Sequence, residues 1–240
     1  MTKSGIEYTE RSDGRGFLDL RPMSAEVGVL PRADGSAVFR IGNTVAYAAV
    51  YGPRELHPKF MQDPSTGILR CHYAMMPFSG HGERVRPVTS RRAKEISLVM
   101  KNALLPVLDL TKFSNTVVDV FVALPHTDAG TRCAGICAAA LALADAGLEM
   151  KDIVAAVSVG VVDGKVLADI NAHEDCDIGA SDIPVAMLPQ SGKISLLQLD
   201  GIVSPKTLKE AFKVAKIACE KVAAVQRDAL KKSVTGEVSL

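Results

Sequence analysis

The sequence has no tryptophan, few aromatic residues and no apolar run long enough to cross a membrane. Aromatic residues make up 5% of its 240 residues, whereas 48% are hydrophobic, and a bilayer-spanning helix needs roughly 20 consecutive apolar residues. Residues 1–15 also lack the apolar region of a secretion signal. We therefore expect a cytoplasmic, globular protein that makes no membrane contact and is long enough to bury a core.

Cysteine is too scarce and too scattered to form a disulfide framework. The five cysteines are odd in number and mostly have apolar neighbours, which is typical of reduced, buried thiols. Cys133 and Cys137 have the i, i+4 spacing of helix neighbours, but no second Cys/His pair follows at a distance that would complete a zinc site. We expect no metal held by thiols. The cysteines are Cys71, Cys133, Cys137, Cys176 and Cys219.

An excess of either charge is also missing. The 28 basic and 27 acidic residues give a formal net charge of +1, which excludes a wholly basic surface of the kind that coats nucleic acid. Any contact with nucleic acid must therefore come from a local cluster. One cluster is present, formed by Arg84, Arg86, Arg91, Arg92, Lys94 and Lys101.

Hydrophobic periodicity predicts alternating strands and helices. Strands are expected at 23–30, 36–40, 44–50, 68–76, 116–124, 154–162, 166–170, 184–188 and 194–198. Helices are expected at 91–110, 132–146 and 204–231, and loops at 52–67 and 77–89. This order favours an α+β fold with two halves of similar make-up. Because no linker separates the halves, we predict a single domain over residues 1–240, with a core at about 11–231 and flexible ends.

The most informative stretch runs from Val117 to Gly147. A β-branched strand breaks at residues 128–130 and restarts as a helix near Thr131. The unpaired N–H groups of a helix N-terminus form an anion site. Thr131 adds a hydroxyl group, and Arg132 adds a guanidinium group suited to phosphate oxygens. The alternative is that Thr131 only caps the helix and Arg132 pairs with a surface carboxylate.

Two further clusters carry charge at element boundaries. Arg91 and Arg92 follow Ser90, the expected cap of a helix, and arginine in a first turn opposes the helix dipole unless a bound anion compensates. A solvated helix start is the alternative.

The segment 173–182 carries four carboxylates between two apolar strands, enough to hold a divalent cation or supply a general acid. Such an acidic loop can equally serve solubility alone.

A series of motifs, in order and spacing, resembles the ribonuclease PH family over about Arg11 to Leu230, and most of all the catalytic PH-type subunit of the archaeal exosome. The motifs are RSDGR at 11–15 and the DLRP that follows, ADGSA at 33–37, GNT at 42–44, SRRAKEI at 90–96, DAGTR at 128–132, ALADAG at 142–147, the acidic segment, and LLQLDG at 196–201. The resemblance implies a ribonuclease PH-like (ribosomal protein S5 domain 2-like) fold of tandem βαβ-type halves. It also implies a phosphorolytic 3′-to-5′ exoribonuclease that releases nucleoside diphosphates.

The resemblance also implies a role for particular basic and turn residues. Arg92 stands at the position of a phosphate-binding arginine that also meets RNA, and Arg91 is its companion on the RNA backbone. Gly130, Thr131 and Arg132 match the turn that holds inorganic phosphate, the co-substrate.

The acidic segment supplies the implied catalytic pair. Asp175 matches the aspartate assigned to catalysis, and Asp182 matches the second acidic position; the two together are the implied ligands of Mg²⁺ or Mn²⁺. The segment is one residue longer between these aspartates than the family pattern, which leaves Asp177 as an alternative to Asp182. Lys59 lies in the loop that resembles the RNA-guiding neck of the family.

The implied partners are RNA, a second PH-type subunit that completes a hexameric ring, and cap subunits of the S1/KH type. Two alternatives remain within the family: a non-catalytic scaffold subunit that binds RNA, and a free-standing ribonuclease PH that trims tRNA as a homohexamer. A generic nucleotide-binding fold is disfavoured because the sequence has no P-loop and no GxGxxG in a βαβ unit.

Overall fold

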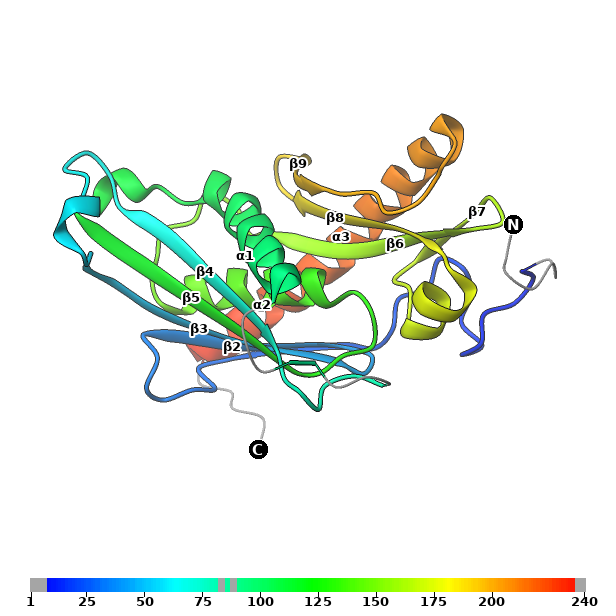
Figure 1. The fold of residues 1–240 in the computed structure, drawn as a ribbon, viewed down its shortest axis with the longest axis horizontal. Helices are drawn as coiled ribbons and strands as arrows, with labels where there is room; N and C mark the ends of the chain where they lie inside the picture. Colours follow the sequence, from blue (N-terminus) through cyan, green and yellow to red (C-terminus); the bar gives the residue numbers. More distant parts are fainter. Residues whose placement is uncertain (1–7, 82–84, 87–89, 236–240) are drawn as a thin grey trace.

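A computed structural model describes residues 8–81, 85–86 and 90–235, and its strands and helices alternate as predicted (Figure 1). The strands are β1 (Met23–Val27), β2 (Gly35–Ile41), β3 (Thr44–Glu55), β4 (Ile68–Met75), β5 (Thr116–His126), β6 (Ala155–Val162), β7 (Lys165–Ala168), β8 (Ser181–Leu188) and β9 (Lys193–Leu197). The α-helices are α1 (Arg91–Leu104), α2 (Thr131–Asp145) and α3 (Pro205–Thr235). Short helical turns are η1 (Lys59–Met61), η2 (Leu105–Val107), η3 (Leu110–Lys112) and η4 (His173–Ile178).

The strands form two sheets. The first has the order β1-β2-β3-β5-β4 and is antiparallel except for β4 and β5, which run parallel and are connected through α1. The second has the order β7-β6-β8-β9 and is antiparallel throughout. Hydrophobic residues of both sheets and all three α-helices belong to one continuous core. Within the described part of the chain, no helix is both long and apolar enough to span a membrane.

Helix α2 lies between the two sheets and packs on both (Figure 1). Twelve of its 15 residues are buried, and most are alanine, glycine or cysteine. Small side chains allow this close approach: a Cβ atom placed on Gly135 would lie 3.3 Å from Cγ1 of Val122 in β5. Residues 133–143 of α2 are all small or apolar, as expected for a helix that is buried on every side. The N-terminus of α2 is therefore held firmly by the core.

Several boundaries differ from the sequence prediction by three residues or more. Strand β1 ends at Val27 instead of 30, and α3 continues to Thr235 instead of ending at 231, into the end that was expected to be flexible. Helix α1 ends at Leu104 instead of 110 because Pro106 has no N–H to continue the ladder, and the 3₁₀ turns η2 and η3 follow. Strand β3 runs on to Glu55, into the expected loop. The acidic segment, predicted to be a loop, contains the π-helical turn η4, and β8 begins at Ser181, before the expected start at 184.

The prediction that the cysteines are buried is confirmed for four of them and wrong for Cys176. Cys71, Cys133, Cys137 and Cys219 lie in the core, whereas Cys176 is exposed on η4. Cys176 lies on the irregular turn η4, whereas the other four cysteines lie within strands and helices of the core.

Candidate active site

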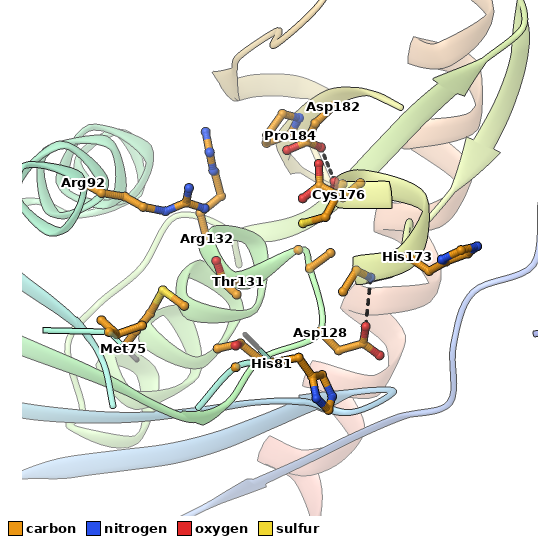
Figure 2. A pocket seen from close by; sticks show the side chains of 18 of the residues that line it. Met75, His81, Arg92, Asp128, Thr131, Arg132, His173, Cys176, Asp182 and Pro184 are labelled. Atoms are coloured by element: carbon orange, nitrogen blue, oxygen red, sulfur yellow. Dashed lines mark hydrogen bonds between the residues drawn. The ribbon is translucent and has the colours of Figure 1, made fainter. Parts of the chain in front are cut away.

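A pocket of about 660 Å³ lies where the two sheets meet (Figure 2). One side is formed by the ends of β4 and β5 and the first turns of α1 and α2. The other side is formed by η4, the start of β8 and Ser158 of β6. Six of the residues implied by the family resemblance line this single pocket. They are Arg92, Gly130, Thr131, Arg132, Asp175 and Asp182.

The segment 128–132, called the anion turn below, leads from β5 into α2. Gly130 is the N-cap of α2 and has a left-handed backbone, with φ +62°, which glycine adopts without steric cost. Ala129 is also left-handed, with φ +52°, a strained conformation for a residue with a Cβ atom. Thr131 is the first helical residue and caps nothing, so its hydroxyl group is available to the pocket. The alternative of a plain threonine cap is therefore wrong.

The two arginines approach the pocket from different helices. Figure 2 shows Arg92 of α1 extending toward Arg132 of α2. Arg132 donates a hydrogen bond of 2.6 Å to Gln198 Oε1, and Gln198 in turn donates to Glu95 of α1 at 3.2 Å. Within the described residues, neither arginine forms an ion pair with a carboxylate, which contradicts the surface-pair alternative for Arg132. Two guanidinium groups and a helix N-terminus therefore face the same space.

Two carboxylates lie on the opposite side. Asp175 is on η4 and Asp182 is the second residue of β8, where it accepts a hydrogen bond from the Ser158 hydroxyl. Burial raises the pKa of Asp175, and the charges of Arg92 and Arg132 offset part of that rise. Burial also raises the pKa of Asp182; the Ser158 hydrogen bond lowers it and the charge of Asp175 raises it further. A raised pKa favours proton donation near neutral pH.

The segment between these aspartates is predicted to be one residue longer than the family pattern, and it contains the π-helical turn η4. In a π-helical turn each N–H bonds to the carbonyl five residues earlier, so the turn takes up one residue more than an α-helical turn. Asp177, the alternative to Asp182, instead points to His173 at 2.8 Å, and its side chain is 69% exposed. Asp177 also lines the pocket, but its carboxylate is paired with His173, whereas the charge of Asp175 acts directly on Asp182.

Two predicted RNA-binding residues lie outside the pocket. Lys59 is in η1, before β4, whereas the pocket is at the far end of β4, next to Met75 (Figure 1). The Lys59 side chain is 75% exposed and lies 3.6 Å from Glu55. Arg91 begins α1 and is exposed; its neighbour Ser90 caps the helix as predicted, accepting from Ala93 N–H at 3.0 Å. Arg84 of the basic cluster lies outside the described residues.

Sequence reasoning missed two polar groups of the pocket region. Ser158 lies within an otherwise apolar strand, and nothing in its neighbours signals contact with a carboxylate. The Tyr73 hydroxyl is buried and has no hydrogen-bond partner within the described chain. The hydroxyl lies close to the Thr131 side chain without forming a well-oriented hydrogen bond. Burial raises the pKa of Tyr73, while this contact with Thr131 and the charges of Arg92 and Arg132 offset part of the rise. A tyrosine on the inward face of an alternating edge strand carries no local signal of such a contact.

A divalent cation would meet two carboxylates here. Across the residues that the structure describes, no group of three or more His, Cys, Asp or Glu side chains is close enough to hold a metal ion. Mg²⁺ nevertheless commonly binds through one or two carboxylates together with substrate phosphates and water. Asp175 and Asp182 fit that mode of binding.

Comparison with known families and sequences gives a consistent result. The first domain of the 3′ exoribonuclease family, RNase PH, matches residues 19–149, and its second domain matches residues 152–218. The exosome complex component Rrp41 of Methanopyrus kandleri is 49% identical over 227 residues, covering 95% of this chain and 94% of that protein. Rrp41 of Nitrosopumilus maritimus is 45% identical over 224 residues, covering 93% and 91%.

Solved structures show the same fold. Rice (Oryza sativa) Rrp46 matches with a TM-score of 0.77 and 27% identity, over 90% of this chain and 98% of that one. A chain of the Archaeoglobus fulgidus exosome with RNA bound to the active site matches with a TM-score of 0.78 and 22% identity, over 89% and 91%. The predicted α+β, ribonuclease PH-like fold is therefore confirmed.

Proposed function

The chain belongs to the 3′ exoribonuclease family of ribonuclease PH, and we propose that it is the catalytic subunit of an exosome-type ring that degrades RNA by phosphorolysis. One observation carries this proposal: two guanidinium groups and a helix N-terminus face two carboxyl groups, whose pKa values burial raises, across one pocket. A scaffold subunit has no need of such a juxtaposition. The reaction would release nucleoside diphosphates from the 3′ end.

Inorganic phosphate would bind on the basic side of the pocket. The N–H groups of the anion turn, the Thr131 hydroxyl and the guanidinium groups of Arg92 and Arg132 are all donors suited to its oxygens. Held there, the phosphate is oriented toward the last phosphodiester of the RNA. The same arginines neutralise the negative charge that develops on the transferring phosphoryl group.

The acidic side would complete the reaction. Asp175, whose pKa is raised by burial, is suited to give a proton to the leaving 3′-oxygen. Asp182, whose carboxylate accepts a hydrogen bond from Ser158, would hold the reacting phosphodiester from the side of the pocket opposite the arginines. Mg²⁺ or Mn²⁺, bound by Asp175 and Asp182, would supply further neutralisation of phosphoryl charge.

RNA and protein partners would contact surfaces outside the pocket. Arg91 and Lys59 are exposed cations that would hold the RNA backbone without sequence preference, with an affinity that falls as salt rises. We propose that a second PH-type subunit completes a hexameric ring, that S1/KH-type subunits cap it, and that the assembly works in the cytoplasm. The names of the Rrp41 relatives support the exosome context.

The test is to incubate the protein, alone and mixed with a second PH-type subunit, with oligo(A), Mg²⁺ and increasing phosphate. We expect release of ADP that requires phosphate, and its loss in Asp175→Asn. The matched control is Asp177→Asn, two residues away on the same turn but exposed and paired with His173, which should retain activity. Release of AMP without phosphate contradicts phosphorolysis. An unchanged rate for a ring carrying Asp175→Asn favours the scaffold subunit.

Sizing of the purified protein separates the remaining alternative. A free-standing tRNA-trimming enzyme forms an active homohexamer, whereas a ring subunit reaches hexameric mass and full activity only with its partner. Analytical ultracentrifugation with an activity assay on each fraction distinguishes these outcomes.

A further inference from the structure

Residues 8–22, which we call the N-terminal arm, contain neither strand nor helix, yet they include two buried arginines. Arg11 is 2% exposed and Arg21 is 5% exposed. Arginine is almost never fully buried unless its charge is paired, because removing the charge from water is costly. The partners of both arginines lie close to the candidate active site.

Arg11 is joined to Glu174 by a two-point ion pair. Its Nε and one terminal nitrogen donate to the two carboxylate oxygens of Glu174, each at 2.8 Å, and both side chains are fully buried. The other donors of Arg11 reach the carbonyl oxygens of Ala168 and Asp169, each at 2.8 Å. Tyr8 of the same arm donates its hydroxyl to Glu174 at 2.8 Å. Tyr8 and Arg11 of the N-terminal arm therefore donate three hydrogen bonds to the carboxylate of Glu174, which lies in η4.

Glu174 immediately precedes Asp175, and its carboxylate and backbone also fix the start of η4. It accepts from the Asn171 N–H at 3.0 Å, and its own N–H donates to Asn171 Oδ1 at 2.9 Å. The Asp175 N–H donates to the Asn171 carbonyl at 3.0 Å. Because Glu174 points into the protein while its neighbour lines the pocket, fixing Glu174 sets the position of Asp175.

Arg21, the second buried arginine of the arm, contacts the basic side of the pocket through Asp128 of the anion turn. It pairs with Asp169 at 2.6 Å and with Asp128 of the anion turn at 3.5 Å, and it donates to the Asp128 carbonyl. Asp128 also accepts from the N–H of Ala172 at 2.9 Å, a contact visible in Figure 2, so the anion turn is tied directly to the residue before η4. One arm thus reaches both sides of the pocket.

We propose that the N-terminal arm is a positioning device, in which Arg11 and Glu174 set the place of Asp175 relative to the anion turn. Its effect on turnover rests on the proposed function, whereas its effect on the backbone of η4 does not. Replacing a buried ion pair by apolar groups of similar volume is often neutral for stability. The expected contribution of this pair is therefore geometric, and an error of about 1 Å at a reacting group costs about 10²-fold in rate.

The test compares single and paired substitutions. Glu174→Gln leaves the Arg11 charge buried without its partner and should destabilise the fold. Arg11→Met/Glu174→Leu removes both charges and should recover most of the melting temperature. We expect this double variant to lose about 10²-fold in kcat with a much smaller change in the KM for phosphate. Amide hydrogens of residues 172–180 should exchange at least 10-fold faster. Arg40→Met/Glu26→Leu, which removes an exposed pair 2.7 Å apart on β1 and β2, is the matched control and should change neither quantity.

Each result decides the proposal. Unchanged exchange at residues 172–180 together with normal kcat in a folded double variant overturns it. If the double variant does not fold, Tyr8→Phe decides, because it removes one donor to Glu174 and leaves every charge in place; faster exchange in η4 supports the proposal and unchanged exchange overturns it. If the unaltered protein does not phosphorolyse RNA, the proposed function fails, but the exchange rates still test the positioning device.

Discussion

The two sides of the pocket are built in different ways. On the basic side, Arg92 and Arg132 sit in the first turns of α1 and α2, and the backbone donors come from the start of a buried helix. On the acidic side, Asp175 sits on the short π-helical turn η4, which depends on contacts with the N-terminal arm. Groups placed by regular elements are robust to distant changes, whereas groups placed by an irregular turn depend on distant residues. Four predictions test this difference, from the largest expected effect to the smallest.

The accessibility of thiols should differ sharply between the two sides. Cys133 and Cys137 lie within α2, and burial raises the pKa of Cys133 far above its ordinary value and that of Cys137 to about 12. A buried thiol with a raised pKa is neither accessible nor ionised at pH 8, so labelling of Cys133 and Cys137 should be negligible in the native protein. Cys176 on η4 is exposed and should react at least 10³-fold faster. Mass spectrometry after iodoacetamide treatment should find one label on the native protein and five on the denatured chain. Equal labelling of Cys137 in the native state would contradict a rigid basic side.

Removing one guanidinium group should abolish most phosphate-dependent activity. Arg92→Met is expected to lower kcat/KM for phosphate by about 10²–10³-fold, since the transition state loses a donor that is already in place. Arg91→Met, its neighbour outside the pocket, should leave the KM for phosphate unchanged and weaken RNA binding, with the slope of log K against log salt reduced by about 1. Steady-state kinetics at several phosphate and salt concentrations separate the two variants. Identical behaviour would show that the two arginines share one role.

A side chain on the anion turn should affect both stability and binding. Gly130→Ala places a Cβ atom at φ +62°, which costs about 1–2 kcal/mol in the free energy of unfolding. Gly147→Ala is the matched control, because Gly147 has φ +76° and open space around its Cβ position. Both variants should lose similar stability in urea unfolding. Phosphate affinity, measured by calorimetry, should fall only in Gly130→Ala; an equal fall in both would mean that strain alone weakens binding.

The smallest effect is expected from the phenol group of Tyr73. Tyr73→Phe removes a buried hydroxyl group that makes no well-oriented hydrogen bond within the described chain, so stability without ligand should be unchanged or higher by up to about 1 kcal/mol. The same substitution should reduce the rise in melting temperature that phosphate produces, because the hydroxyl lies close to Thr131, a proposed donor to the anion. Thermal melts with and without phosphate measure both quantities. A lower melting temperature without ligand would contradict an unpaired hydroxyl.

The basic side was predictable because its signals are local. A cap at Ser90, a glycine turn before a small-residue helix and arginines at both helix starts all lie within short segments, and the structure brings Arg92, Thr131 and Arg132 together. The roles that the family resemblance assigns to these residues stay predictions until the activity of the variants is measured.

The acidic side was less predictable because its determinants are distant. The segment 173–182 looked like a loop, since nothing within it indicates that Glu174 is fully buried. Its partner Arg11 is 163 residues away in the sequence. Ser158 likewise meets Asp182 only through the pairing of β6 with β8. Sequence patterns encode periodicity, but such contacts depend on the register between elements that the periodicity does not fix.

The burial of α2 has a kinetic consequence for the ligand. The N–H groups of the anion turn lie at the start of a helix that is packed between two sheets, so they belong to the part of the protein that we expect to open least often. An anion arriving from solvent therefore meets N–H donors that are already oriented. Association should therefore be governed by diffusion and charge, and the occupancy of the turn should track the concentration of free phosphate without lag.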